Sequence, residues 1–272
     1  MTLAKTDNTR AVSRRAQALQ AIPEGHLDMD VTQEELRDLM AENYAEGEAP
    51  RFPRIGFPTG GGKHYSVQVG EKSEALEKLR AAIVHHHQAR AYFGPGAATS
   101  RPPVCSSLDG QTGSLPRQGD RFGECRTCVH GRFGTAVNDK GEAGAGAACK
   151  DTRRLYILLP GESMPRLLTL PPGSLRNWQE FRDNQLMPLG LGLRGAIVEV
   201  GLEQTRNDNS IQYSRSTFRL GGRLDAESRA MVQALYEAVS RQSQAVAVTQ
   251  EDYVVGEPAG SARPAGENNL PF

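Results

Sequence analysis

The sequence predicts a mainly β protein with two helices in its body (α+β), arranged as an OB-like five-stranded barrel with a large four-cysteine zinc-binding loop. Three observations lead to this prediction. Five segments alternate apolar and polar residues, and two segments repeat apolar residues at helical spacing. The four cysteines of the chain all fall in one glycine-rich stretch.

Composition divides the chain into a folded body and two polar ends. The 272 residues carry no net formal charge and only 38% are hydrophobic, which is low for one compact domain of this length. We expect residues 1–50 to form a mostly disordered arm with one helical stretch, Val31 to Tyr44. Residues 51–243 form the OB-like domain with its zinc loop at 101–150. Residues 244–272 form a flexible acidic tail that ends in Leu-Pro-Phe.

Five strands are expected in the body, because apolar side chains recur there at every second position. They cover residues 79–93, 153–160, 165–170, 194–202 and 211–220. The second and third strands resemble a hairpin across Pro160-Gly161-Glu162. The fourth and fifth are separated by the turn-like Asn207-Asp208-Asn209.

Two helices are expected between and after these strands. The first follows a Ser174 cap and ends before Pro188, which places it between the third and fourth strands. The second follows an Asp225 cap. Apolar residues recur three or four positions apart in both, at Leu175, Trp178 and Phe181 and at Val232, Leu235 and Val239.

The cysteines have the spacing of one metal site. Cys125 and Cys128 form a C-x2-C knuckle, and Cys105 and Cys149 lie about twenty residues away on either side. Four thiolates complete the tetrahedral shell that Zn²⁺ prefers, so we expect a structural rather than a catalytic zinc. The alternatives are an iron–sulfur cluster, two disulfides or unrelated thiols. Disulfides are disfavoured because residues 2–15 lack the apolar run of a signal peptide, which predicts a cytoplasmic protein.

Charge and aromatic residues favour single-stranded DNA as the partner. Residues 101–223 hold 17 Lys or Arg against 12 Asp or Glu, a net charge of +5, whereas residues 244–272 hold four acids and one arginine. Strand alternation predicts faces that combine arginines for phosphate with aromatic rings for base stacking. These DNA-binding candidates are His86, Arg90 and Tyr92 on one strand, Arg154 and Tyr156 on another, and Tyr213, Arg215 and Arg219 on a third. An ordinary solvated sheet face is the alternative for each strand.

Several motifs resemble a group of little-characterised phage and mobile-element proteins. The motifs are Pro103 to Gly110, Gly123 to Cys128, Ala148 to Leu155, Leu159 to Gly161 and Leu170 to Pro172. This resemblance spans residues 50–240. It implies that the cytoplasm is that of a bacterial or phage-infected host cell, and it implies little about activity. The last five residues resemble the C-terminal tip of bacterial single-stranded DNA-binding proteins, which implies that Leu270, Pro271 and Phe272 bind replication or recombination proteins.

These observations predict a non-catalytic single-stranded DNA-binding protein that protects DNA and recruits partners through its tip. No catalytic triad, paired-carboxylate signature or nucleotide fingerprint stands out. The alternatives are a zinc-containing protein-interaction or nuclease-accessory module that binds no DNA, and a small metal-dependent nuclease. No apolar run reaches the length of a membrane span, so no membrane partner is expected, while a homo-oligomer is compatible with the sequence.

Overall fold

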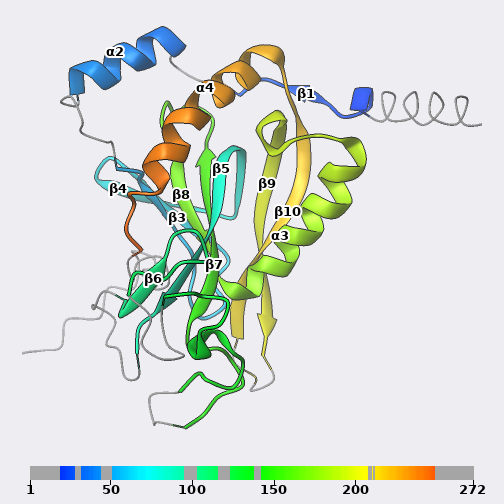
Figure 1. Cartoon of the computed structure of the whole chain (residues 1–272). Helices are drawn as coiled ribbons and strands as arrows, with labels where there is room; N and C mark the ends of the chain where they lie inside the picture. The colour runs from blue at the N-terminus through cyan, green and yellow to red at the C-terminus, as the bar shows by residue number, and fades with distance from the viewer. Residues whose placement is uncertain are drawn as a thin grey trace, which may run out of the picture.

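The computed structural model describes residues 19–27, 32–43, 51–94, 103–115, 123–137, 142–207, 210 and 212–248. Within these residues ten strands form one mixed sheet in the order β1-β10-β9-β5-β7-β8-β2-β3-β4, and β6 pairs separately with β5. The sheet curls into a half-barrel flanked by helices (Figure 1). The prediction of a five-stranded OB-like barrel built around a zinc-binding loop is therefore wrong.

Every predicted strand is present, and the sheet also contains strands that sequence patterning missed. The strands are β1 (Glu24–Gly25), β2 (Arg54–Gly56), β3 (Tyr65–Val69), β4 (Lys72–Leu76), β5 (Lys78–Tyr92), β6 (Cys105–Ser107), β7 (Lys150–Leu158), β8 (Arg166–Leu170), β9 (Ala196–Arg206) and β10 (Gln212–Leu224). The expected antiparallel pairs β7–β8 and β9–β10 are confirmed. The missed strands are short, and β4 is almost wholly exposed, so neither its length nor its polarity marks it as part of a sheet.

The predicted helices are confirmed as α2 (Gln33–Asn43), α3 (Leu175–Phe181) and α4 (Ala226–Ser243). A capping box begins α2, where the Thr32 hydroxyl accepts the Glu35 N–H and the Glu35 carboxylate accepts the Thr32 N–H. Asp225 caps α4 by accepting the Ser228 N–H at 2.8 Å. In the described part of the chain, no helix combines the length and apolar character needed to cross a membrane.

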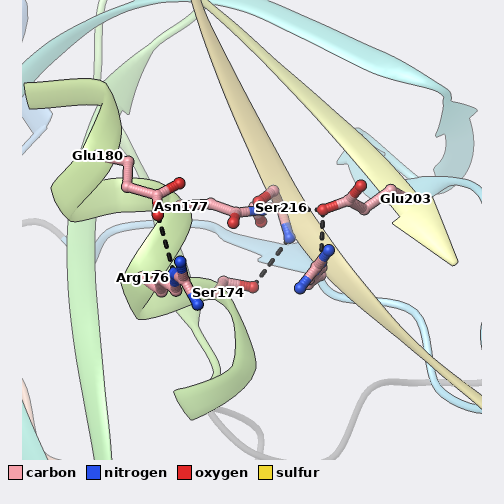
Figure 2. A network of polar contacts seen from close by, with 7 residues as sticks. Ser174, Arg176, Asn177, Glu180, Glu203 and Ser216 are labelled. Carbon is pink, nitrogen blue, oxygen red and sulfur yellow. Dashed lines mark hydrogen bonds and ion pairs between the residues drawn. The ribbon is translucent and has the colours of Figure 1, made fainter. Parts of the chain in front are cut away.

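Ser174 does not cap α3 with its side chain, but instead ties the helix to the edge of β10 (Figure 2). Its hydroxyl accepts the Ser216 N–H at 2.8 Å, and the Asn177 amide donates to the Ser216 carbonyl at 2.8 Å and to the Glu203 carboxylate at 2.9 Å. Gln185 pairs two more backbone groups further along the strand. Side chains of the α3 region thus satisfy part of a strand edge that would otherwise be open.

Both faces of the sheet are buried over much of their area. The inner core lies on the concave face and includes Leu155 of β7, Val198 of β9 and Trp178 of α3. The Tyr65 hydroxyl donates across this space to the Gly201 carbonyl at 3.0 Å, so β3 meets β9 through the interior. The outer core lies under α4 and includes Tyr156 of β7.

Candidate functional site

Three segments bring the cysteines together at the lower end of the sheet in Figure 1. We define residues 103–115, 123–137 and 142–149 as the cysteine lobe. Cys105 lies on β6, opposite Tyr92 of β5. The Cys149 N–H donates to the His130 carbonyl and the Cys125 N–H to the Gln111 carbonyl, both at 2.7 Å. These bonds place all four cysteines, as free thiols, around one small cavity.

The four thiols line one cavity, but they are not arranged there as a set of metal ligands. In the described ranges no group of three or more His, Cys, Asp or Glu side chains is arranged to hold a metal ion. Burial, and then the charges of the other cysteines, raise the pKa of Cys149 to about 12. Burial also raises the pKa of Cys125. The donor set of four thiols fits Zn²⁺ chemically, since a divalent cation stabilises thiolates that otherwise repel one another.

Aromatic and cationic side chains of β5 line the same cavity. The Tyr92 ring stacks on the His130 ring with centroids 4.0 Å apart. The Arg90 guanidinium donates to the Cys125 carbonyl at 3.2 Å and lies 3.7 Å from the Asp151 carboxylate. Both predicted DNA-binding residues are therefore engaged in joining β5 to its neighbours.

A cationic cluster lies further along β5, between the sheet and α3. His86 packs edge-on against Trp178, with ring centroids 5.4 Å apart, and the Arg182 guanidinium lies 5.4 Å from the centre of the same ring. Burial, and then the charges of Arg153 and Arg182, lower the pKa of His86 to about 3. Burial, and then Arg182, also lower the pKa of Arg153. We call His86, Arg153, Trp178 and Arg182 the inner cationic cluster.

Each member of the inner cationic cluster has a buried nitrogen without a hydrogen-bond partner in the described structure. The atoms are His86 Nδ1, Arg153 Nε, Trp178 Nε1 and Arg182 Nε. Two arginines side by side are electrostatically unfavourable unless an anion joins them, and unpaired buried donors add to that cost. The cluster is thus suited to an oxyanion such as a phosphate.

The face predicted for Arg154 and Tyr156 is wrong, because both side chains are 0% exposed. The Arg154 guanidinium donates to the carbonyls of Val246 and Ala247, at 2.6 and 2.8 Å. Tyr156 packs against Phe52 in the outer core, with ring centroids 4.8 Å apart. Neither residue is placed to touch a nucleic acid.

The third predicted group lies on β10, away from the inner core. Arg215 pairs with Glu203 at 2.5 Å and Arg219 pairs with Glu199 at 2.5 Å, each across β9 and β10. Tyr213 lies close to Gly173, beside the start of α3. Cross-strand carboxylates therefore offset the charge that this face would offer to phosphate.

The structure describes only the beginning of the predicted tail. Residues 244–248 are held against the body by Arg154 and by the packing of Val248 against Ala89 and Ala91. The predicted partner-binding residues Leu270, Pro271 and Phe272 lie outside the described residues.

Sequence reasoning missed Arg153 and Arg182. Arg153 and Arg154 are consecutive on β7, so their side chains point to opposite faces of the sheet. Choosing Arg153 required knowing which of these faces lies against α3. Arg182 follows Trp178 by four positions on a predicted helix, and that spacing brings a cation over an aromatic ring. Comparison with known proteins finds no family model, no curated protein and no solved structure that matches this chain.

Proposed function

We propose that the protein binds single-stranded DNA along the inner face of β5 and β7, and that zinc bound by the four cysteines holds the cysteine lobe at one end of this path. The observation that carries the proposal is the inner cationic cluster, where Arg153 and Arg182 repel each other and four buried nitrogens have no hydrogen-bond partner among the described residues. The DNA backbone supplies phosphates, which guanidinium groups bind with good geometry.

The path runs along one row of β5 side chains. His86 and Arg90 are four positions apart on β5, so their side chains lie on the same face of the strand. Both come after the irregular pairing between Ile83 and His85. The seven strand residues from His86 to Tyr92 cover about 20 Å. Asp151 is beside this row but is tied to Gln88 at 2.8 Å and faces Arg90. The row thus joins the inner cationic cluster to the cysteine lobe.

An exposed aromatic residue of the cysteine lobe supports base stacking. The Phe133 side chain is 88% exposed and follows the exposed Arg132 in the chain. Bases stack on exposed aromatic rings with little sequence preference. The net positive charge of residues 101–223 agrees with this partner.

Binding of an oligothymidine at two salt concentrations tests this function. Arg153→Gln and Arg182→Gln should each weaken binding about tenfold, because each removes a charge-assisted contact. Each should also reduce the slope of log K against log salt by about 0.7, the value for one phosphate contact on a single strand. Fluorescence anisotropy measures both quantities.

Arg219→Gln is the matched control, because Arg219 is an exposed arginine of β10 that pairs with Glu199 of β9. It should keep the affinity and salt slope of the parent. A loss of affinity in Arg219→Gln, with Arg153→Gln and Arg182→Gln unchanged, would place the DNA on β10. Absence of salt-sensitive binding in the parent would favour the protein-interaction module instead.

The same proposal gives the C-terminal tip the role of recruiting replication or recombination proteins. Proline limits the conformational entropy lost when a short segment docks, and Phe272 offers one aromatic ring to a pocket on the partner. Deleting residues 267–272 should leave melting temperature and oligothymidine affinity unchanged, while abolishing binding to purified replication proteins in a pull-down. Unfolding of the truncated protein would show instead that the tip is a packed structural element.

A further inference from the structure

A cavity of about 480 Å³ opens where β5 and β9 separate. The two strands pair only over Lys78 to Ala82 of β5, and beyond that point the segment 190–195 replaces β9 beside the strand. Helix α4 closes the third side. Val84 and His85 of β5, Arg194 of the segment and Tyr236 of α4 line the space. Its volume is in the range of small-molecule sites.

The lining is cationic. Arg194 and Arg229 both line the cavity, and no acidic side chain does so among the described residues. Neither arginine forms an ion pair with a described carboxylate, whereas Arg215 and Arg219 on the neighbouring strand each have one. Arginines that line a cavity without a counter-ion favour an anionic occupant.

The Arg194 guanidinium is held in a defined position. It lies 4.0 Å from the centre of the Tyr236 ring, and its Nε donates to Gln233 at 2.9 Å. A guanidinium that lies over a ring can still direct its outer N–H groups to a planar, two-point contact. Such a fork suits phosphate or carboxylate oxygens.

Two buried histidine nitrogens in the cavity wall have no partner in the described structure, namely His85 Nε2 and His86 Nδ1. Burial, followed by the charges of His87 and Arg194, lowers the pKa of His85 to about 4, so its ring is neutral near pH 7. Gly192 has open space where a Cβ would be, so the segment 190–195 leaves room for an approaching group. The cavity thus offers polar contacts that the described residues leave unused.

We propose that this cavity binds a small phosphate-bearing ligand of nucleoside monophosphate size, with Arg194 and Arg229 as its phosphate contacts. Two guanidinium groups match the charge of a phosphate monoester better than that of a single carboxylate. The remaining volume, lined by Val84 and Tyr236, accommodates a ring. This site is separate from the DNA path, although His86 borders both.

Isothermal titration with adenosine monophosphate, inorganic phosphate and adenosine tests the proposal near pH 7. The monophosphate should bind tightest, phosphate should bind more weakly, and adenosine should not bind measurably. Arg229→Gln and Arg194→Gln should each weaken binding of the monophosphate at least tenfold. Arg241→Gln is the matched control, because it removes an exposed arginine from the same helix outside the cavity.

Equal binding by Arg229→Gln and the parent, or no binding of either phosphate probe, would overturn the proposal. A 5′-phosphorylated oligothymidine that displaces the monophosphate would identify the end of a DNA strand as the source of the phosphate. Failure of that oligonucleotide to compete, with the monophosphate still bound, would identify a free nucleotide. Arg229→Gln should retain affinity for unphosphorylated oligothymidine, so failure here leaves the DNA-binding proposal untouched.

Discussion

Replacing Tyr156 by alanine should destabilise the protein by about 3 to 5 kcal/mol, the range for removing a large aromatic side chain from a core. The ring is 0% exposed and packs against Phe52. It also lies within 5.8 Å of the His85 and His87 rings, centre to centre, so its loss leaves a cavity among aromatic neighbours. Urea denaturation measures the change as a lower midpoint with a similar slope.

Two variants control this experiment. Tyr156→Phe keeps the ring and removes only the hydroxyl, which lies 3.4 Å from His87 Nε2, so it should cost far less than the alanine variant. Tyr213→Ala removes a partly exposed ring on β10 and should cost less than Tyr156→Ala. A Tyr156→Ala protein as stable as the parent but weaker in DNA binding would restore the sequence-based hypothesis that this ring stacks on bases.

Chelation of zinc should unfold the cysteine lobe while leaving the sheet folded. We expect about one zinc per chain by metal analysis, lost in Cys128→Ser, because three thiolates and one hydroxyl bind zinc far more weakly than four thiolates. Structural zinc sites in small peptides contribute about 10 to 16 kcal/mol of apparent binding free energy. Removing zinc should therefore destabilise the cysteine lobe by a measurable amount. Hydrogen exchange should accelerate in residues 123–137 and 142–149 but not in β9 and β10.

Thr127→Ala is the matched control for the cysteine variant. Thr127 lies between the two knuckle cysteines, is exposed and has no sulfur, so its replacement should keep the metal and the exchange rates of the parent. A parent protein without metal, or a Cys128→Ser protein as protected as the parent, would contradict the zinc proposal. Iron in place of zinc, with visible absorption, would identify the iron–sulfur alternative.

Sequence patterning found the four longest strands and β8, whose five residues are all buried, and it missed strands of two to five residues. β5 and β10 span 15 and 13 residues, which gives the period of two many repeats. By contrast β2 has three residues, and β4 is exposed at four of its five positions. β2 pairs with β8, which is distant in sequence, whereas β4 pairs with the preceding strand β3.

The face of the sheet on which each side chain lies was the property hardest to predict from the sequence. A residue pair such as Arg153 and Arg154 looks the same from either side until the other layers are known. Helix α4 covers one face of the sheet and the curl of the sheet encloses the other. Polar side chains on either face of a strand can therefore be buried. The irregular pairing between Ile83 and His85 adds a further shift. Arg154 is buried because carbonyls of residues 246 and 247 satisfy it, which no local pattern indicates.

The sequence by itself determined the local features of this protein. Alternation marked the five main strands, the Asp225 cap marked the start of α4, and the spacing of four cysteines marked the segments that meet around one cavity. Only the tertiary structure decided the strand order, the curl of the sheet and the partners of Arg153 and Arg182. The physical reason is range: caps and periodicity act within one or two turns of chain, whereas burial and charge pairing depend on residues that folding brings together from far apart.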